Sequence, residues 1–234
     1  MLNTIFEDSD FLVINKPADL VCHPTKGDAY SSVIGRVRMH LGSGAEAHMV
    51  HRLDRETSGV LIIAKRKGAA SLLQHLWRER LVRKGYFAIV HGWPTSDDAL
   101  IDAPLGKDLE SRIAIKDRVC ADGAEATTRY FVERRFSKEG RSFALLRVEP
   151  VTGRKHQIRI HLAHVGHPIV GDKIYGGDEN AYLSFVQGSM TEAQRSMLLL
   201  PSQALHARDL RFTWHGRHLE FVAEPEPWFT AFQE

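Results

Sequence analysis

Ten consecutive residues decide the fold of this chain: His51-Arg52-Leu53-Asp54-Arg55-Glu56-Thr57-Ser58-Gly59-Val60. A carboxylate stands between two arginines, and a polar turn leads into the apolar run Val60-Leu61-Ile62-Ile63-Ala64. Because this run is short, rich in β-branched residues and bounded by Gly59 and Lys65, it predicts a buried strand. Asp54 is then expected on a loop at the edge of a rigid element, where a reactive side chain can reach a substrate.

The arginines beside Asp54 allow two interpretations. A lone aspartate on a loop usually pairs with a neighbouring arginine, here Arg52 or Arg55, and has no further role. The complete string, however, resembles the signature HRLDxxTSG of the RluA family of RNA pseudouridine synthases. That resemblance implies that Asp54 is the catalytic carboxylate. It also implies that Arg52 fills the gap left by a base flipped out of its stack.

Composition describes a folded protein. A chain of 234 residues can bury one sizeable core, or two small lobes that share a cleft. The hydrophobic fraction of 43% and the charged fraction of 26% exclude a disordered chain. No apolar run approaches the roughly 20 residues of a membrane span, and the N-terminus does not resemble a signal peptide. Two cysteines are too few for a disulfide framework, which predicts a reducing, cytoplasmic location.

Charge is sorted along the chain, although the net charge is only +2. Residues 65–84 contain seven Lys or Arg against one acid, and residues 129–159 contain nine against three. The last fifteen residues contain four acids and no Lys or Arg. This distribution favours a side that faces phosphates, although solvated charged faces give the same pattern.

Two strands carry further motifs of the family. Phe11-Leu12-Val13-Ile14-Asn15-Lys16-Pro17 resembles "VxNKPxGL", with Asp19 where Gly is common. Lys84-Gly85-Tyr86-Phe87-Ala88-Ile89-Val90-His91-Gly92 resembles "KxYxAxVxG", and its β-branched and aromatic residues predict a strand. The resemblance implies that Tyr86 lies against the target base, while a tyrosine that only fills a strand face is the alternative.

The second strong motif is Gly153-Arg154-Lys155-His156-Gln157-Ile158-Arg159-Ile160-His161-Leu162. It resembles "GR(T/S)HQIRxH", with Lys155 in place of a small hydroxyl residue. As a helix, it places Arg159 beside an apolar stripe of Ile158, Leu162 and Val165. A half-buried guanidinium needs a carboxylate, and we expect this to be Asp54. In the family, the arginine at this place pairs with the catalytic aspartate.

The RNA-binding side chains are expected on the same segments. Basic residues there would hold phosphates, so binding should weaken as the salt concentration rises. The residues expected to bind RNA are Arg52, His51, Lys16, Lys84, Arg154 and His156.

His161, His164 and His167 suggest a metal site by their spacing, but the third side chain turns away from the helix face of the others and no acidic ligand is adjacent. No metal is therefore expected. The segments 166–176 and 205–212 resemble the family motifs "GHPxxGDxxYG" and "LHAxxLxF". They are expected to form the cleft floor and a closing strand.

The reaction implied by the resemblance breaks the bond between ribose and the uracil nitrogen, turns the ring and rejoins it through carbon. Nothing enters or leaves, so no cofactor is expected. An ionised Asp54 would act either as a nucleophile or as a general base, and the sequence leaves both open. Arg159 would keep that carboxylate charged, and Tyr86 would stack on the uracil and shuttle a proton.

The resemblance implies an α+β pseudouridine synthase fold: a large, mainly antiparallel mixed sheet flanked by helices, with a central RNA-binding cleft. Periodicity predicts helices over residues 31–41, 69–80 and 180–201, and strands over residues 126–136 and 142–148. Residues 1–234 are expected to form one catalytic domain with two sub-lobes that share the cleft. Because the first strand begins near Phe11, we expect a compact member without the N-terminal accessory RNA-binding domain.

The expected substrate is a uridine in structured rRNA or in a tRNA stem-loop. The protein is expected to act as a monomer and not to associate with a membrane. Two functions of other classes remain as alternatives. One is a non-catalytic RNA-binding or chaperone module of the same fold. The other is a metal-dependent hydrolase built on His161 and its neighbours.

Overall fold

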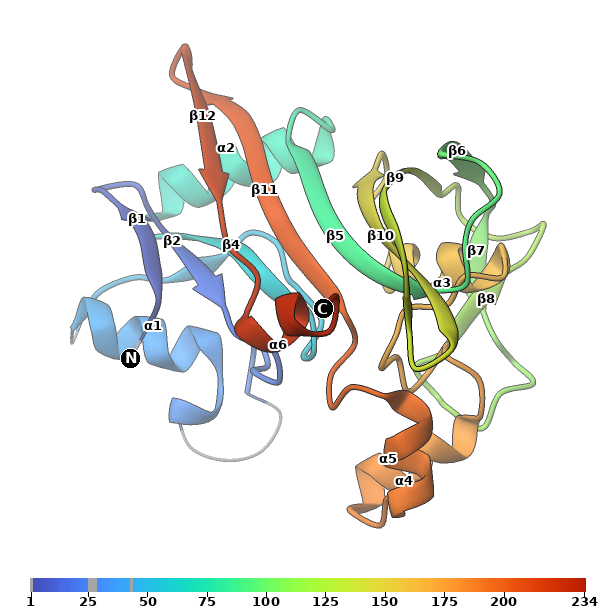
Figure 1. Cartoon of the computed structure of the whole chain (residues 1–234). Helices are drawn as coiled ribbons and strands as arrows, with labels where there is room; N and C mark the ends of the chain where they lie inside the picture. Colours follow the sequence, from blue (N-terminus) through green and yellow to red (C-terminus); the bar gives the residue numbers. More distant parts are fainter. Residues whose placement is uncertain (1, 25–28, 43) are drawn as a thin grey trace. The chain divides into compact units, whose positions relative to one another are not determined.

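The computed structural model describes residues 2–24, 29–42 and 44–234 (Figure 1). The chain forms two compact units: Met1–Tyr86 with His206–Ala231, and Phe87–Leu205 with Phe232–Glu234. Helices flank mainly antiparallel strands, so the predicted α+β class is confirmed. The organisation as one domain with a shared cleft stays a prediction.

The first unit is built on β2 (Phe11–Lys16) and β4 (Ser58–Ala64), which pair antiparallel. All seven residues of β4 are buried, as predicted for the apolar run after Asp54. Further strands extend the sheet on both sides, in the order β1-β2-β4-β11, with β3 beside β4 and β12 beside β11. Their bounds are Thr4–Glu7 for β1, His48–Met49 for β3, Leu205–Trp214 for β11 and Arg217–Val222 for β12.

Strands β2 and β4 are buried on both faces: successive side chains of a strand point to opposite sides, and a helix packs against each side. One face of β2 and β4, with Phe11 and Ile62, packs with the apolar side of α2 (Lys67–Arg78). The other face, with Ile14 and Ile63, packs with α1 (Val33–Leu41). Each such side chain, when fully buried, stabilises the fold by about 1.5–3 kcal/mol. The unit also contains η1 (Ala29–Ser31) and α6 (Pro227–Ala231).

The second unit contains strands in the order β5-β10-β9-β6, of which β9 pairs antiparallel with both β10 and β6, and a separate pair of short strands, β7 and β8. Strand β5 (Arg83–His91) begins in the first unit and ends in the second. The remaining bounds are β6 Asp98–Asp102, β7 Leu105–Lys107, β8 Asp117–Val119, β9 Thr127–Lys138, β10 Arg141–Pro150, α3 Gln157–His164, α4 Glu179–Gln187 and α5 Glu192–Leu198.

The predicted helices and strands are present, with ends shifted by a few residues, except that residues 180–201 form two helices, α4 and α5, and not one. The short elements β1, β12 and α6 were not predicted. The prediction of a strand over residues 205–212 is confirmed, but it is not the last strand, because β12 follows it. They belong to β11, which pairs in parallel with β4 and antiparallel with β12 that follows it. Within the described ranges, no helix has the length and apolar character needed to span a membrane.

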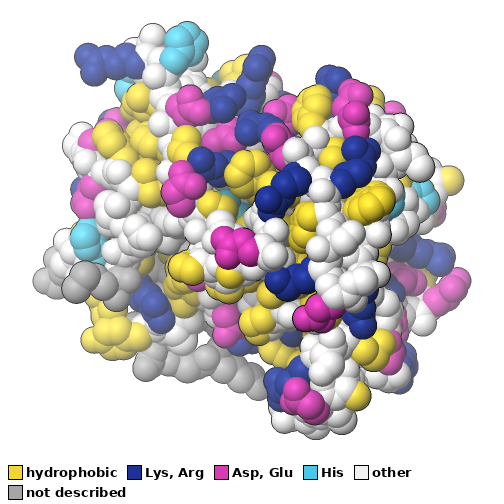
Figure 2. Space-filling view, viewed as in Figure 1, with side chains coloured by type: hydrophobic (Ala, Val, Ile, Leu, Met, Phe, Trp, Pro, Cys, Tyr) yellow, Lys and Arg dark blue, Asp and Glu magenta, His cyan; other side chains and the backbone are white. Residues whose placement is uncertain are grey.

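Side chains of both charges share the visible surface. Figure 2 shows Lys and Arg interspersed with Asp and Glu over the face in view. This mixing agrees with the small net charge of +2. Individual exposed arginines, and not one large basic patch, are therefore the groups to consider as phosphate ligands on this face.

Strands β4 and β11 come close together at Gly59, which pairs with Ala207 in the parallel part of the sheet. Gly59 has a φ of +111°, which favours glycine, and an added Cβ would lie 2.1 Å from the carbonyl oxygen of Ala207. We predict that Gly59→Ala lowers the free energy of unfolding by about 3 kcal/mol or more, measured by urea denaturation.

Gly216→Ala is the matched control. Gly216 also has a positive φ, of +79°, but no atom lies within 4 Å of an added Cβ. This variant should therefore lose only about 1 kcal/mol, the cost of the backbone conformation alone. Equal losses in the two variants would contradict the close approach at Gly59.

Candidate active site

Asp54 lies in a turn whose flanking residues are buried. Its own side chain is partly exposed, whereas Leu53 and Thr57 on either side are 5% and 2% exposed. The Thr57 amide donates to the carbonyl oxygen of Asp54 at 3.2 Å and closes the turn immediately before β4. The predicted loop at the edge of a buried strand is therefore confirmed, and it leaves the Asp54 carboxylate partly accessible.

Lys16, at the end of β2, holds this turn in place through hydrogen bonds. The side chain is fully buried, and its ammonium group donates to the carbonyl oxygens of Pro17 (2.8 Å), Leu20 (2.9 Å) and Arg55 (3.0 Å). Burial lowers the pKa of Lys16 to about 8, although nearby acidic groups that include Asp54 oppose the shift. The expectation that Lys16 contacts RNA is wrong, because its ammonium group is buried and donates to these three carbonyl oxygens.

Two more contacts join the segment after Lys16 to the Asp54 turn. The Cys22 thiol lies 3.3 Å from the carbonyl oxygen of Leu53, and Arg55 Nε donates to Asp19 Oδ1 at 2.6 Å. The carbonyls on both sides of Asp54 are thus held by side chains from one short segment. Asp19 itself has a φ of +64°, a conformation that glycine adopts most easily, which explains why the related motif has Gly there.

Tyr86 lies in β5 and packs against the apolar cluster that contains Leu53 and Leu61. Burial and the negative charge of Asp54 raise the pKa of Tyr86. The phenol therefore stays protonated at neutral pH and can donate a hydrogen bond. Tyr86 and Leu53, the residue before Asp54, thus pack in the same apolar cluster of the first unit.

His51 contacts groups of the protein itself. Its ring stacks on Trp77 with a centroid separation of 4.6 Å, and Nε2 accepts a hydrogen bond from the Ile62 amide at 3.1 Å. Burial, and then the positive charge of Lys84, lower the pKa of His51 to about 3. The ring is neutral at physiological pH, and the expectation that His51 binds RNA stays a prediction. Trp77 packs against the core as predicted.

Arg159, in the second unit, is 5% exposed and forms a two-bond ion pair with Asp172. Nε lies 2.7 Å from Oδ2, and Nη2 lies 2.8 Å from Oδ1. Burial raises the pKa of Asp172, but the charge and hydrogen bonds of Arg159 outweigh it and hold this pKa below its usual range. The prediction that Arg159 needs a carboxylate is confirmed, with a partner that the sequence analysis did not consider. A pairing with Asp54, in the other unit, stays a prediction.

The turn before α3 is fixed by hydrogen bonds of Gln157. Its side-chain oxygen accepts from the Arg154 amide (3.0 Å) and from the Thr152 hydroxyl (2.6 Å). His156 has a left-handed conformation with a φ of +55°, and its Nδ1 lies 3.0 Å from the Tyr175 hydroxyl. His156 is partly buried, whereas Arg154 is exposed.

The other residues expected to bind RNA differ in accessibility. Arg52 and Arg154 are exposed, and Arg154 Nε also donates to the carbonyl oxygen of Glu125 at 3.0 Å. Lys84 is partly buried, and burial lowers its pKa. Lys155, the departure from the related motif, is exposed and pairs with Asp117 at 2.8 Å. Arg52 and Arg154 are therefore the best placed of these cations to meet a phosphate.

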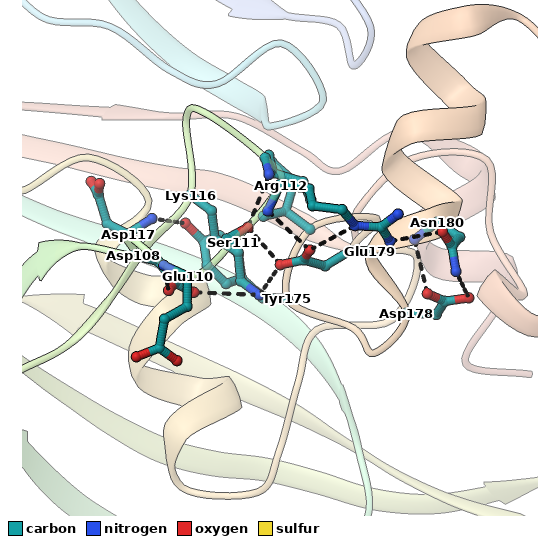
Figure 3. Close-up of polar contacts among 12 residues, drawn as sticks. Asp108, Glu110, Ser111, Arg112, Lys116, Asp117, Tyr175, Asp178, Glu179 and Asn180 are labelled. Atoms are coloured by element: carbon teal, nitrogen blue, oxygen red, sulfur yellow. Dashed lines mark hydrogen bonds and ion pairs between the residues drawn. The ribbon is translucent and has the colours of Figure 1, made fainter.

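The second unit contains a polar network that was not predicted from the sequence. Glu179 at the start of α4 accepts from the Ser111 hydroxyl at 2.5 Å and pairs with Lys116 at 2.9 Å (Figure 3). These two contacts lower the pKa of Glu179 to about 2. The Asp117 amide, 3.3 Å from the Tyr175 hydroxyl, connects this network to the turn that holds His156.

His161 and His167, two of the three histidines with the spacing of a metal site, contact polar groups of the protein. Both ring nitrogens of His161 are engaged at 2.9 Å, one with the Thr128 hydroxyl and one with the Ala103 carbonyl. His167 Nδ1 contacts the carbonyl oxygen of His91 at 3.0 Å. In the part of the chain that the structure describes, no three His, Cys, Asp or Glu residues form a group that could hold a metal ion.

We predict that Lys16→Met lowers the free energy of unfolding by about 2–3 kcal/mol, because three buried carbonyls lose their donor. Methionine keeps a similar volume, so packing changes little. Urea denaturation measures the loss, and Lys67→Met, at an exposed lysine of α2, is the control that should be close to neutral. A similar loss in both variants would contradict the role of the Lys16 ammonium group.

The same residue has a pH signature. The folded state releases the Lys16 proton near pH 8, whereas the reference value for an unperturbed lysine is 10.5. Between these values the unfolded state binds more protons, so Lys16 makes the free energy of unfolding rise with pH. The stability difference between the wild type and Lys16→Met should therefore widen from about pH 7.5 to about pH 9.5. A difference that is constant over this range would contradict the lowered pKa.

Comparison with known proteins agrees with these motifs. Residues 10–164 match the family model described as RNA pseudouridylate synthase. The chain is 37% identical over 227 residues to ribosomal large subunit pseudouridine synthase D of Vibrio cholerae, covering 95% of this chain and 67% of that protein. It is 37% identical over 213 residues to the protein of the same name from Pasteurella multocida, covering 90% and 62%. The chain thus spans roughly two thirds of the length of these relatives.

A solved structure gives the same assignment. Human RNA Pseudouridylate Synthase Domain Containing 1 superposes with a TM-score of 0.76 at 25% identity, covering 97% of this chain and 84% of that one. The family model accounts for more than half of the chain, and the resemblance to the RluA family is confirmed. The chain belongs to the RNA pseudouridylate synthase family, whose members are isomerases that convert uridine to pseudouridine in RNA.

Proposed function

We propose that this chain isomerises a uridine in a structured RNA to pseudouridine, with Asp54 as the reacting carboxylate. The observation that carries the proposal is the packing of Tyr86 against the apolar cluster that contains Leu53, the residue before the partly accessible Asp54. A carboxylate on a secured turn, with a partly buried phenol packed against the same cluster, offers a group that can attack or deprotonate at the sugar and an aromatic face for the base.

The remaining roles follow from accessibility. Arg52 is exposed two residues before Asp54 and would occupy the gap left by the extruded base. Arg154, Lys84 and His156, which all lie in the family motifs, would contact the RNA backbone. Arg159 would stabilise the charged form of Asp54, since an opposite charge within a few Å lowers the pKa of a carboxyl group. No cofactor is needed, because the reaction only rearranges the uridine.

The first substrate to test is large-subunit rRNA. The Vibrio and Pasteurella relatives are named as ribosomal large subunit pseudouridine synthases, and their sequences match this chain over at least nine tenths of its length. A tRNA stem-loop is the second candidate. We further propose that the protein acts as a monomer in the cytoplasm. Mapping pseudouridines in total RNA from cells with and without the gene identifies the target directly.

We predict that Asp54→Asn reduces isomerisation by on the order of 10³-fold or more, because the amide can neither attack the sugar nor accept its proton. The measurement is tritium release from rRNA and tRNA transcripts labelled at the uracil 5-position. RNA affinity should stay close to that of the wild type, since Asp54 contributes no positive charge.

Glu133→Gln, at an exposed carboxylate of β9, is the control and should release tritium at the wild-type rate. Release by Asp54→Asn at the wild-type rate would overturn the catalytic role of Asp54. Tight RNA binding by a wild-type protein that isomerises no uridine in total RNA would instead favour the non-catalytic RNA-binding module.

We predict that Arg154→Ala weakens RNA binding and makes the slope of log K against log salt shallower by about 0.7–0.9, the contribution of one phosphate contact. Filter binding at several salt concentrations measures both. Arg217→Ala, at an exposed arginine of the β11–β12 hairpin, is the control. If both variants changed the slope equally, a specific phosphate contact at Arg154 would be refuted.

A further inference from the structure

Two groups from one short segment hold the guanidinium group of Arg159. The Asp172 carboxylate binds its Nε and Nη2 at 2.7 and 2.8 Å. The ring of Tyr175, three residues later, lies under the same guanidinium, 5.1 Å from its centroid. A two-bond ion pair fixes the plane of a guanidinium, and an aromatic face at this distance adds a cation–π attraction. Together they restrict both the direction and the tilt of the Arg159 head group.

The Asp172 carboxylate is itself held rigidly. The side chain is buried, and Oδ1 also accepts hydrogen bonds from the backbone amides of Ile174 (2.9 Å) and Tyr175 (3.0 Å). The backbone around it is closely packed, because a Cβ added at Gly171 would lie 2.3 Å from the carbonyl oxygen of Ser202. A Cβ at Gly176 would lie 2.3 Å from the carbonyl oxygen of Asp172. The segment is therefore a fixed support for Arg159.

Tyr175 connects this support to the turn before α3. Its hydroxyl lies 3.0 Å from His156 Nδ1 and accepts from the Asp117 amide at 3.3 Å. Figure 3 shows Tyr175 beside Asp117 in the network of Glu179 and Lys116. The ring that contacts Arg159 is thus fixed at its far end by polar contacts, and rotation of the ring away from the guanidinium would break them.

We propose that Asp172 and Tyr175 are positioning residues that orient Arg159 for the isomerisation, and this proposal rests on the proposed function. A full ion pair inside a protein costs desolvation, and an apolar pair of similar volume is often as stable. Stability alone therefore does not require a buried charge pair here. An arginine that must act with its guanidinium in one direction does require it, since displacement of a reactive group by about 1 Å can cost about 10²-fold in rate.

A double-mutant cycle tests the pair. Asp172→Asn keeps the shape but removes the charge, and it should lower kcat on the order of 10²-fold with KM for RNA unchanged. In an Arg159→Met background, Asp172→Asn should have no further effect on kcat, because its target is absent. In that background it should also raise the Tm, since it removes a buried carboxylate that has lost its partner.

The aromatic contact has its own series, which remains informative if Asp172→Asn does not fold. Tyr175→Leu should lower kcat on the order of tenfold, the equivalent of a partly buried cation–π contact, with KM unchanged. Tyr175→Phe keeps the ring and should retain clearly more activity than Tyr175→Leu. Asp98→Asn, which removes an exposed ion pair with Arg129 in the same unit, is the control and should leave kcat and Tm close to the wild type.

The outcomes separate the two proposals. Equal losses of kcat from Asp172→Asn with and without Arg159 would overturn the positioning role, as would equal activities of the leucine and phenylalanine variants at position 175. A wild-type protein that isomerises no uridine would overturn the proposed function. The Tm comparison in the Arg159→Met background needs no activity, and a lower Tm on adding Asp172→Asn would overturn the pairing by itself.

Discussion

The buried ammonium group of Lys16 is the interaction on which the Asp54 turn depends. A fully buried lysine is costly unless its donors are satisfied, and the carbonyl oxygens of Pro17, Leu20 and Arg55 satisfy them. The same bonds tie the end of β2 to the residue after Asp54. Because Cys22 also contacts the carbonyl of Leu53, the backbone on both sides of the Asp54 carboxylate is secured. Asp54 is therefore held by its neighbours and still keeps its own side chain partly accessible.

The second unit also contains a buried cation whose donors are satisfied. There a buried guanidinium, Arg159, is satisfied by a carboxylate from the segment around Asp172, which backbone amides hold in place. In both units a charge is removed from water, and the cost is offset by bonds that permit only one geometry. Such sites suit a reaction that rearranges a single nucleotide, because the protein contributes orientation and electrostatics and no chemical group is transferred.

Not every basic residue of the family motifs carries an exposed charge. Lys16 donates to backbone carbonyls, and His51 is neutral and stacks on Trp77. Arg52 and Arg154 are exposed. On the face shown in Figure 2, Lys and Arg are interspersed with Asp and Glu, so this face carries no broad positive field. A basic residue of a motif can thus support the fold around Asp54 without an exposed charge.

The sequence by itself determined the α+β class, the buried strand after Asp54, the helix that carries Arg159 and the family, because local periodicity and contiguous motifs encode all of these. It did not reveal that Lys16 points inward, since a lysine after a strand is compatible with either direction. It also did not reveal that Asp172 is the partner of Arg159. Which carboxylate meets a buried guanidinium depends on the packing of a helix against a later turn, and tight glycines and backbone amides decide that packing. Only the tertiary structure brings these groups together, because the ion pair is set by distance in space and not by spacing along the chain.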